Sequence, residues 1–254
     1  MPLIFCIPEV AMLGRIHSCE TLGGADGPGL RYVLFMQGCP LRCLYCHNPD
    51  TWDIRGGREV TDTEAAAEII RYKRYFGRRG GVTVSGGEPL IQAEFVASLF
   101  SLLKKENIHT ALDTSGAVYR ENLPGIDALL SRTDLVLLDI KHIDAEGATR
   151  LTGRKNDGTL ALAERLSRDG IPVWIRQVLL PGVTDTEEYL TRTREFIDRL
   201  GNVGRVEVLP YHTLGRVKYE KLGIEYPLGD LPVPDAESVK RAKQILCRDA
   251  GDGK

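Results

Sequence analysis

The sequence predicts an α/β fold: a partial, open TIM-like (β/α)6 barrel. Short apolar runs alternate along the chain with stretches of helical character, a pattern typical of parallel βαβ units. From Leu30 to Tyr211 six such units follow one another at roughly 30 residues each, the spacing of an eight-unit barrel. Because two units are missing, we expect a curved sheet that does not close and leaves a lateral cleft. A flat, doubly wound sheet is the competing architecture.

A short N-terminal hairpin is expected before the first long strand, which starts at Leu30. A loosely held lead-in over residues 1–12 precedes a short strand from Gly14 to Ser18, and the glycine-rich segment 22–29 then reverses the chain. The runs that predict the later strands are residues 81–84, 109–112, 135–138, 173–178 and 205–209.

Helices are predicted between these strands. The sequence from Thr61 to Glu64 is a capping box, so a helix should begin there and run to about Phe76. The other predicted helices are residues 94–105, 161–168, 187–200 and a final helix at 235–247 that packs over the sheet. Residues 251–254 should fray. We therefore expect one domain over 1–254, with a lead-in and hairpin to residue 29, six β/α units over 30–211 and a C-terminal extension from 212.

Composition narrows the class of protein. A chain of 254 residues with 43% hydrophobic content can bury a substantial core, and a net charge of -2 gives no basic field for nucleic acid. The opening apolar run is short and broken by Pro8, which excludes a signal peptide or membrane span there. We expect a cytoplasmic protein that binds neither nucleic acid nor membrane. Six cysteines, half of them in one motif, do not form a disulfide framework. Cys6, Cys19 and Cys247 are expected as buried small hydrophobes.

Three cysteines gather in one loop directly after the first strand. Cys39, Cys43 and Cys46 lie within eight residues, and thiolates are the ligands that iron–sulfur clusters and zinc prefer. A cubane cluster has four irons, so three cysteines leave one iron open to a small molecule. The alternative is a Cys3His zinc site that includes His47. His47 is adjacent to Cys46 and is poorly placed to turn back onto the same ion, and the chain has no second Cys or His pair at finger-like spacing.

Polar residues follow each predicted strand, at the end where parallel α/β folds bind ligands. These strand-end segments are the cysteine loop, 85–89, 113–116, 139–141, Arg176 and 211–212. Each has a structural explanation: Gly86 and Gly87 suit a turn, Asp113 suits a helix cap, and Asp139 with Lys141 suits an ion pair. No Gly-Lys-Ser or Gly-Lys-Thr follows the glycines, which argues against a phosphate loop. Their coincidence at one rim predicts a binding site.

The cysteine motif CxxxCxxC, with Tyr45 before its last cysteine, resembles that of the radical S-adenosylmethionine (SAM) enzymes. Together with the sequences Asp26-Gly27-Pro28-Gly29 and Cys46-His47-Asn48-Pro49, it makes the chain similar to pyruvate formate-lyase-activating enzymes from about Gly14 to about Gly223. This resemblance implies an incomplete barrel, a [4Fe-4S] cluster on the three cysteines, and SAM. It implies reductive cleavage of SAM to a 5′-deoxyadenosyl radical, which takes a hydrogen from a glycine Cα of pyruvate formate-lyase and leaves a glycyl radical.

The resemblance also implies roles for residues along the rim. Those implied for the methionyl and ribose groups of SAM are Gly86, Gly87, Glu88, Asp113, Ser115, Asp139, Ile140 and Lys141, with Arg176 on the polar rim. Those implied for the adenine side are Tyr45, His47 and His212. Asp113, Thr114 and Asp139 are implied to hold a monovalent cation, Na+ or K+, which suits hard oxygen ligands. Asp26 is implied to contact the glycine loop of the protein substrate.

The choice of partner follows from what the chain lacks. Residues 48–80 contain no cysteine, whereas activators of other glycyl-radical enzymes often carry a ferredoxin-like insert there. Pyruvate formate-lyase is therefore the favoured substrate, flavodoxin or ferredoxin the expected electron donor, and a monomer the expected state. The basic run 71–79 is interpreted as a solvated helix end, or alternatively as a docking patch for an acidic donor such as flavodoxin. Other functions left open are a radical SAM enzyme that acts on another glycyl-radical enzyme or on a small molecule, and a non-catalytic iron–sulfur or zinc module.

Overall fold

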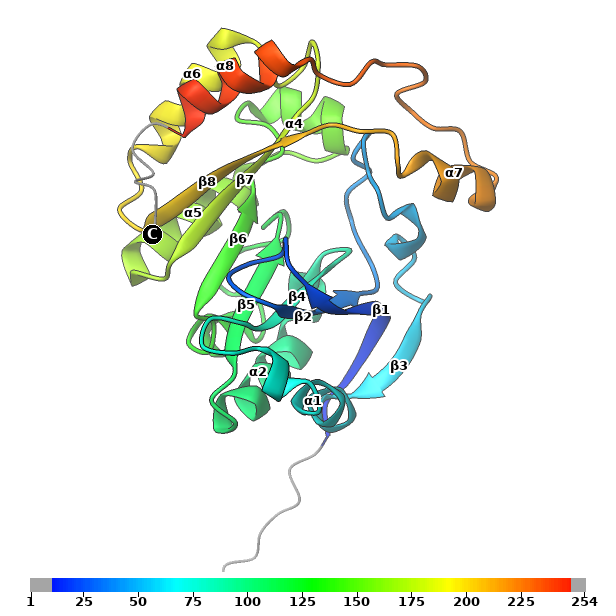
Figure 1. The fold of residues 1–254 in the computed structure, drawn as a ribbon, viewed down its shortest axis with the longest axis vertical. Coiled ribbons are helices and arrows are strands. Elements are labelled where there is room, and N and C mark those ends of the chain that lie inside the picture. Colours follow the sequence, from blue (N-terminus) through cyan, green and yellow to red (C-terminus); the bar gives the residue numbers. More distant parts are fainter. Residues whose placement is uncertain (1–10, 248–254) are drawn as a thin grey trace, which may run out of the picture.

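A single eight-stranded sheet organises the computed structural model, which describes residues 11–247 (Figure 1). The strand order is β3-β1-β2-β4-β5-β6-β7-β8, and all pairings from β2 to β8 are parallel. The parallel strands are β2 (Arg31–Met36), β4 (Gly81–Gly86), β5 (His109–Thr114), β6 (Leu135–Asp139), β7 (Val173–Leu179) and β8 (Val203–Pro210). Each new strand is added beside the previous one, as in a barrel, whereas a doubly wound sheet would reverse its order. The six predicted units are therefore correct, and the sheet stays open.

The N-terminal hairpin extends the sheet on its β2 side. Strand β1 (Leu13–Gly23) runs antiparallel to both β2 and a short edge strand, β3 (Arg58–Thr61). The hairpin prediction is confirmed, although β1 is longer than the predicted segment 14–18. Strand β3 was not predicted, because a four-residue edge strand in which only Val60 is buried gives almost no alternating pattern.

Helix α1 (Asp62–Ile70) begins as predicted and ends earlier. The Thr61 hydroxyl accepts a hydrogen bond from the Glu64 backbone N–H (3.1 Å), and the Glu64 carboxylate accepts one from the Thr61 N–H (2.8 Å). The helix stops at Ile70 rather than Phe76, and a 3-10 turn, η2 (Lys73–Tyr75), follows. The chain has to turn into β4 at this point, and it does so through Gly77, whose φ is +56°.

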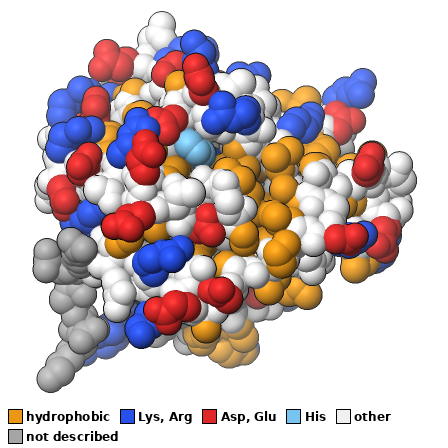
Figure 2. Space-filling view, turned by 90° about the horizontal axis from the view of Figure 1, so that it is seen from above, with side chains coloured by type: hydrophobic (Ala, Val, Ile, Leu, Met, Phe, Trp, Pro, Cys, Tyr) orange, Lys and Arg blue, Asp and Glu red, His pale blue; other side chains and the backbone are white. Residues whose placement is uncertain are grey.

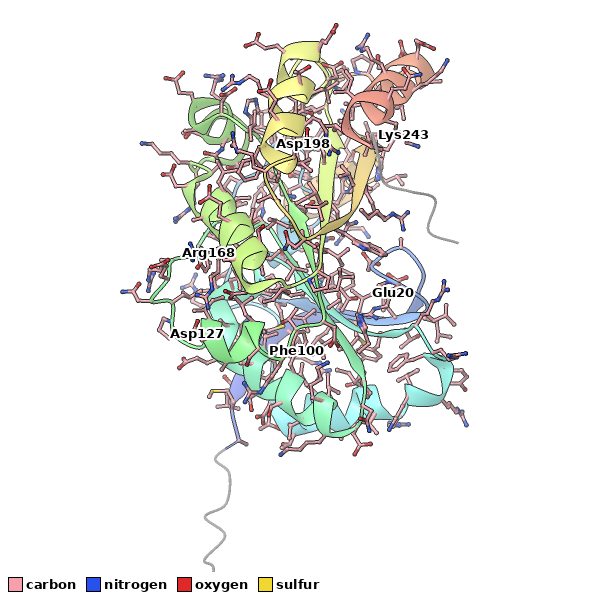
Figure 3. All side chains as sticks on the ribbon, turned by 90° about the vertical axis from the view of Figure 1, so that its left-hand side faces the viewer. Glu20, Phe100, Asp127, Arg168, Asp198 and Lys243 are labelled. Carbon is pink, nitrogen blue, oxygen red and sulfur yellow. The ribbon has the colours of Figure 1, made fainter. Side chains whose placement is uncertain are left out.

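Helices cover the outer face of the sheet. They are α2 (Ala93–Lys105), α3 (Ile126–Leu130), α4 (Ala145–Thr152), α5 (Asp157–Asp169) and α6 (Glu187–Ile197), with 3-10 turns η1 (Pro49–Thr51) and η3 (Pro89–Gln92). In Figure 3, Phe100 of α2 points toward the sheet, where it is fully buried, while Asp127 and Arg168 lie on the solvent side. This layer and the sheet enclose the main hydrophobic core.

The C-terminal extension contains α7 (Arg216–Leu222) and α8 (Ala236–Leu246). The predicted final helix is confirmed: the Asp235 carboxylate caps it by accepting the Ser238 N–H (2.7 Å), and α8 packs against α6 and β8. The expectation of fraying at 251–254 lies outside the described residues. Seen from above, hydrophobic side chains form a band across the middle of the molecule, between a side rich in charge and the side that carries α7 (Figure 2).

The structure bears on two further expectations, the burial of the isolated cysteines and the lack of a membrane span. Cys19 is exposed, so its prediction as a buried hydrophobe is wrong; Cys247 is half-buried and Cys6 lies outside the described residues. The antiparallel edge that carries Cys19 turns this residue toward solvent. Within residues 11–247, no helix combines the length and apolarity needed to cross a bilayer.

Candidate active site

A cleft of about 520 Å³ opens at the carboxyl ends of the parallel strands. Each of the six parallel strands contributes to its wall. The residues predicted from the sequence that line it are Asp26, Cys39, Cys43, Tyr45, Cys46, His47, Gly86, Gly87, Asp113, Thr114, Ser115, Asp139, Lys141, Arg176 and His212. The folded chain thus brings together residues that lie up to 186 positions apart in the sequence, from Asp26 to His212.

The cysteine loop is held by backbone hydrogen bonds on both flanks. Gly38 N–H donates to Thr51 O (2.7 Å), and Arg42 N–H donates to Thr152 O at the end of α4 (2.8 Å). The β4 turn packs directly behind the loop: a Cβ on Gly87 would lie 2.0 Å from Gly38 O, so only glycine fits. The backbone therefore fixes the three cysteines around one side of the cleft.

The thiols of this loop carry protons when no metal is bound. Burial raises the pKa of Cys39 and of Cys43 to about 12, although the Lys141 ammonium opposes the rise at both. Burial also raises the pKa of the Cys46 thiol. The Asn48 backbone N–H and the Trp52 side chain, which face its sulfur, oppose this rise. Metal binding at these thiols must therefore release protons.

The arrangement fits a cluster better than a zinc ion. The His47 ring stacks on His212 at 4.2 Å, and its Nε2 lies 3.2 Å from the His212 carbonyl, so it does not turn back to the thiols. A cubane takes one thiolate on each of three separate irons, so the three cysteines suffice without His47. The zinc alternative is disfavoured on this geometry.

The inner face of the cleft is an acidic network around Arg176. The Asp113 carboxylate accepts hydrogen bonds from Ser85 Oγ (2.6 Å) and Arg176 Nη1 (3.2 Å), and Asp26 and Glu207 lie 3.9 and 3.8 Å from the same guanidinium. Burial raises the pKa of Asp113 to about 6, although Arg176 opposes the rise. The second oxygen of Asp113, Oδ1, is buried and finds no hydrogen-bond partner within residues 11–247. It is an acceptor available to a ligand in the cleft.

A buried cation lies between this network and the cysteines. Lys141 Nζ donates to Asp139 Oδ2 (2.9 Å) and lies 5.8 Å from the centre of the Tyr45 ring. Burial alone would lower the pKa of Lys141, but Asp139, Tyr45 and Cys43 together raise it well above its usual value. Lys141, Asp139 and Tyr45 all line the cleft. The Lys141–Asp139 ion pair therefore holds two strand-end side chains together and can also contact a ligand.

Two predicted residues do not present their side chains to the cleft. Glu88 is fully buried behind it and accepts hydrogen bonds from Thr114 Oγ1, from the hydroxyl and the backbone N–H of Ser115, and from Leu90 N–H. The Ile140 side chain is also buried, and its backbone N–H donates to Arg176 O (3.1 Å). Glu88 therefore orients the segment after β5 and does not itself line the cleft.

The segment that carries Asp26 is fixed from inside the barrel. Thr83 Oγ1 of β4 donates to Asp26 O (2.6 Å) and accepts from Arg31 Nε (2.9 Å). Arg31 and Thr83 are both fully buried. Gly29 has a φ of +70°, and a Cβ there would lie 2.6 Å from Gly80 N. This chain of contacts ties the glycine-rich turn to the sheet.

The C-terminal extension closes over the cysteine loop. Lys218 Nζ of α7 donates to Asn48 Oδ1 (2.8 Å) and pairs with Asp50 (2.9 Å). A Cβ on Gly215 would lie 2.8 Å from the His47 ring, so the backbone before α7 packs directly on that histidine. Figure 1 shows α7 beside the segment that follows β2.

Some lining residues were missed in the sequence. They are Phe35, Leu41, Asn48, Thr51, Val178, Leu209 and Pro210. Strand alternation is a signal that could have found two of them, since Val178 is two residues after Arg176 on β7 and Leu209 of β8 is two residues before Tyr211 in the predicted segment 211–212. Leu41, Asn48 and Thr51 lie in the loop and its 3-10 turn, where no periodicity exists.

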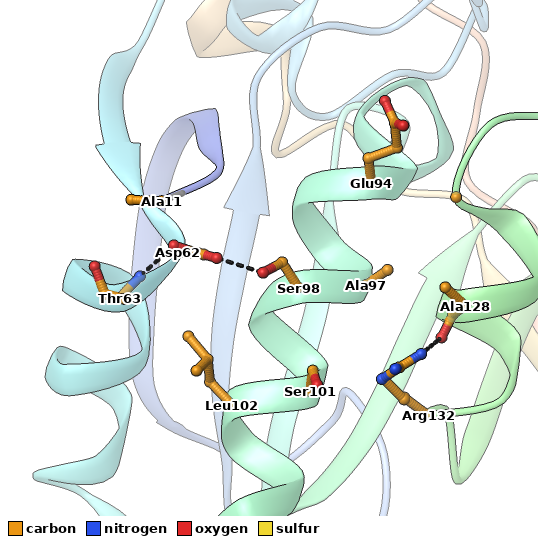
Figure 4. A pocket seen from close by; sticks show the side chains of 11 residues that line it. Ala11, Asp62, Thr63, Glu94, Ala97, Ser98, Ser101, Leu102, Ala128 and Arg132 are labelled. Atoms are coloured by element: carbon orange, nitrogen blue, oxygen red, sulfur yellow. Dashed lines mark hydrogen bonds between the residues drawn. The ribbon is translucent and has the colours of Figure 1, made fainter. Parts of the chain in front are cut away.

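A second hollow, of about 330 Å³, lies in the helical layer between α1, α2 and α3 (Figure 4). The Asp62 carboxylate accepts from Ser98 Oγ and from the Thr63 N–H (2.8 Å), and Arg132 Nη1 donates to Ala128 O (2.7 Å). The Ser98–Asp62 bond joins α2 to α1, whereas the other two bonds are local to α1 and to the segment around α3. The chemistry of the molecule is at the strand ends.

Comparison with known proteins agrees with this location. The model of the radical SAM superfamily matches residues 33–197, the stretch that holds the cysteine loop and most of the cleft. A pyruvate formate-lyase-activating enzyme of Staphylococcus aureus (strain USA300) is 53% identical over 238 residues, which are 92% of this chain and 95% of that protein. The chain belongs to the pyruvate formate-lyase-activating enzyme family of the radical SAM superfamily. It is a radical SAM enzyme, and membership of this family implies a [4Fe-4S] cluster and SAM as cofactors.

Solved structures agree in fold. A domain of the pyruvate-formate lyase-activating enzyme from Bacteroides vulgatus superposes with a TM-score of 0.55 at 26% identity, over 66% of this chain and 92% of that one. Streptococcus suis SuiB, solved with its precursor peptide SuiA, gives a TM-score of 0.66 at 17% identity, over 85% of this chain and 45% of that one. The second likeness concerns the fold alone. Together they support the partial barrel.

Proposed function

We propose that this protein activates pyruvate formate-lyase by generating a glycyl radical on it. The observation that carries the proposal is a loop of three thiols at the carboxyl ends of the strands of an open partial barrel. This loop lies beside a cleft large enough for a nucleotide. The 53% identity to an enzyme named for this activity supports the choice of substrate. The expectations of a cytoplasmic monomer and of flavodoxin or ferredoxin as electron donor belong to the same proposal.

The cluster ligands in this proposal are Cys39, Cys43 and Cys46. When bound, the cluster supplies the electron that cleaves SAM into methionine and a 5′-deoxyadenosyl radical. Gly86 and Gly87 line the cleft beside the loop, and Lys141 offers an ammonium to the methionyl carboxylate. The stacked rings of His47 and His212, with Tyr45, offer an aromatic surface to adenine. Glu88 and Ile140 would act through the backbone segments that they orient.

A monovalent cation, Na+ or K+, beside the bound SAM belongs to the same proposal. Asp113 contributes a buried carboxylate oxygen without a partner, and Asp139 and Thr114 line the cleft near it. Hard oxygen ligands suit such an ion. A bound cation would offset the acidic charge that burial makes costly at Asp113.

The protein substrate would enter through the open side of the barrel. In this proposal Asp26 contacts the backbone of the glycine loop, because it lies at the edge of the cleft on a segment fixed by Thr83. Its carboxylate lies 3.9 Å from Arg176, close enough to be attracted and far enough to turn outward. An acceptor at this edge suits the N–H groups of an extended peptide.

The test is electron paramagnetic resonance on an anaerobic mixture of the reconstituted enzyme, SAM and pyruvate formate-lyase. We expect a glycyl-radical doublet with the wild type and none with Cys43→Ala. The Asp26→Asn variant should still cleave SAM with a chemical reductant and yield a weaker doublet. Methionine and 5′-deoxyadenosine without a doublet would retain the radical chemistry and remove pyruvate formate-lyase as the substrate.

A further inference from the structure

A third, more open hollow lies on the outer side of the cysteine loop. Its volume is about 670 Å³, and its wall is mainly apolar. The lining side chains include Pro40, Trp52, Ile54, Ile91, Leu222 and Ile224. Cys39 lines both this outer groove and the SAM cleft. A single residue of the loop therefore separates the outer surface from the thiols.

Large apolar side chains in the wall of the groove are exposed to solvent. Ile54 is 53% exposed and Leu222 is 47% exposed, and both line the groove, one from the segment after the cysteine loop and one from the end of α7. Trp52 is half-buried between the groove and Cys46, and the Arg42 guanidinium lies 4.7 Å over its ring. An apolar centre with a charged rim is the composition of a protein-binding surface.

The rim of the groove is cationic. Arg42 donates to the carbonyls of Cys39 and Leu41 (2.8 Å each), and Arg154 donates to Pro40 O (3.2 Å). These partners are neutral, so both positive charges remain available to an external anion. Lys155 is exposed beside Arg154. Arg150 is exposed in the last turn of α4, where it forms a solvent-exposed ion pair with Glu146 (3.8 Å). The rim thus attracts an acidic surface.

The acidic side chains within the groove are already neutralised. Asp50 pairs with Lys218 (2.9 Å) and with His17 (3.1 Å), and Asp53 pairs with Arg55 (3.2 Å). The groove therefore has a positive electrostatic balance close to the cluster ligands.

The basic run 71–79, by contrast, lies at the wrong end of the sheet. It precedes Gly81 at the start of β4, whereas the cysteine loop follows Met36 at the end of the parallel strand β2. Six strand residues, about 20 Å, separate the two ends. Lys73 of the run also pairs with Glu106 (3.2 Å). The structure favours the solvated-helix interpretation of this run over a docking patch.

We infer that the outer groove is the docking face of an acidic one-electron carrier protein that reduces the cluster. The inference deepens the proposed function, since it assumes that the three cysteines hold a redox cluster. One electron leaves the carrier, which is oxidised, and reduces the cluster; no bond or proton need move. The groove is opposite the cleft across Cys39, so the carrier reaches the cluster without displacing SAM or the protein substrate.

The test measures binding and reduction separately, with an acidic flavodoxin as the probe. The charge variant is Arg150→Glu with Lys155→Glu, the groove variant is Leu222→Asp, and the matched control is Arg78→Glu with Arg79→Glu at the far end of the sheet. These side chains are exposed and contact neither the cysteines nor the cleft. We expect the association rate of flavodoxin to fall about tenfold in the charge variant, with a weaker dependence on salt, and to stay unchanged in the control.

Two reaction arms complete the design. With flavodoxin as reductant, SAM cleavage should fall in the charge and groove variants; with dithionite, it should equal that of the wild type. Loss of dithionite-driven cleavage in the wild type would refute the proposed function itself. Equal flavodoxin binding and reduction in all four proteins would refute only the docking face. A fall confined to glycyl-radical yield, with flavodoxin binding intact, would also refute it and assign the groove to pyruvate formate-lyase.

Discussion

The hydroxyl of Thr83 is predicted to contribute both to the free energy of unfolding and to the binding of the protein substrate. It is fully buried, and it joins the guanidinium of Arg31 to the carbonyl of Asp26. Thr83→Val keeps the shape of the side chain and removes both hydrogen bonds. A bond to a charged group contributes about 1.5–3 kcal/mol and a neutral one about 1 kcal/mol, so we expect a loss of about 3 kcal/mol. For a chain of this length the thermal midpoint should fall by about 6–10 °C.

The same change should affect the two half-reactions differently. Asp26 is on the segment that Thr83 fixes, whereas the cysteines and Lys141 are on other segments. SAM cleavage driven by dithionite should stay near the wild-type rate, while the KM for pyruvate formate-lyase should rise roughly tenfold, or about 1.4 kcal/mol. The measurements are calorimetry, SAM turnover and radical yield by paramagnetic resonance.

Thr83→Ser is the matched control, because it keeps the hydroxyl and loses one methyl group, at a cost of about 1 kcal/mol. It should retain the wild-type KM. If the serine variant behaved like the valine variant, packing rather than hydrogen bonding would hold the segment. If Thr83→Val changed neither the midpoint nor the KM, the reasoning about this hydroxyl would be wrong.

Three other predictions concern the cleft. Cys43→Ala should abolish iron loading after anaerobic reconstitution, whereas His47→Ala should keep it; metal analysis showing equal losses would revive a Cys3His site. In the apo-protein the pKa of Cys39 and Cys43 is raised from 9.0 to about 12, so their contribution to stability is complete below pH 9 and is lost as pH rises toward 12. Urea unfolding should show this decline in the wild type and a flatter profile in the Cys39→Ala, Cys43→Ala double variant. The pKa of Asp113 is raised from 3.8 to about 6, so its contribution is complete below pH 3.8 and is lost as pH rises through 6. Asp113→Asn should therefore raise the free energy of unfolding of the apo-protein at pH 7. The same change should weaken SAM binding measured by calorimetry. A variant less stable than the wild type at pH 7 would contradict the stability prediction.

The units of the barrel could be predicted because each has a local signal. The runs at 81–84 and 135–138 are buried strands bounded by turn residues, and they appear in the structure with their ends extended by one or two residues. The capping box at Thr61 fixed the start of α1, since two reciprocal hydrogen bonds need only residues three apart. Its end was mispredicted because helical propensity continues past Ile70, while the need to enter β4 does not show in the local sequence.

The sequence predicted which residues gather at the site. It did not predict how their side chains are oriented. Strand ends identified Asp113, Asp139 and Arg176, because parallel strands bring their carboxyl ends to one edge. The same reasoning placed Glu88 in the cleft, although it is turned behind it, because sequence does not specify on which side of a turn a side chain lies. The connection from Thr83 to Asp26 was also out of reach, since it joins residues 57 positions apart.

Helix α7 supports the cysteine loop, so the position of this loop depends on a segment about 170 residues later in the chain. Lys218 and the backbone at Gly215 clasp residues 47–50 from across the seam that the unclosed sheet leaves. A ribosome must therefore have made nearly all of the polypeptide before the metal-binding loop acquires its final support. Insertion of the metal is accordingly expected to follow synthesis of this clasp rather than to accompany the folding of the first strand.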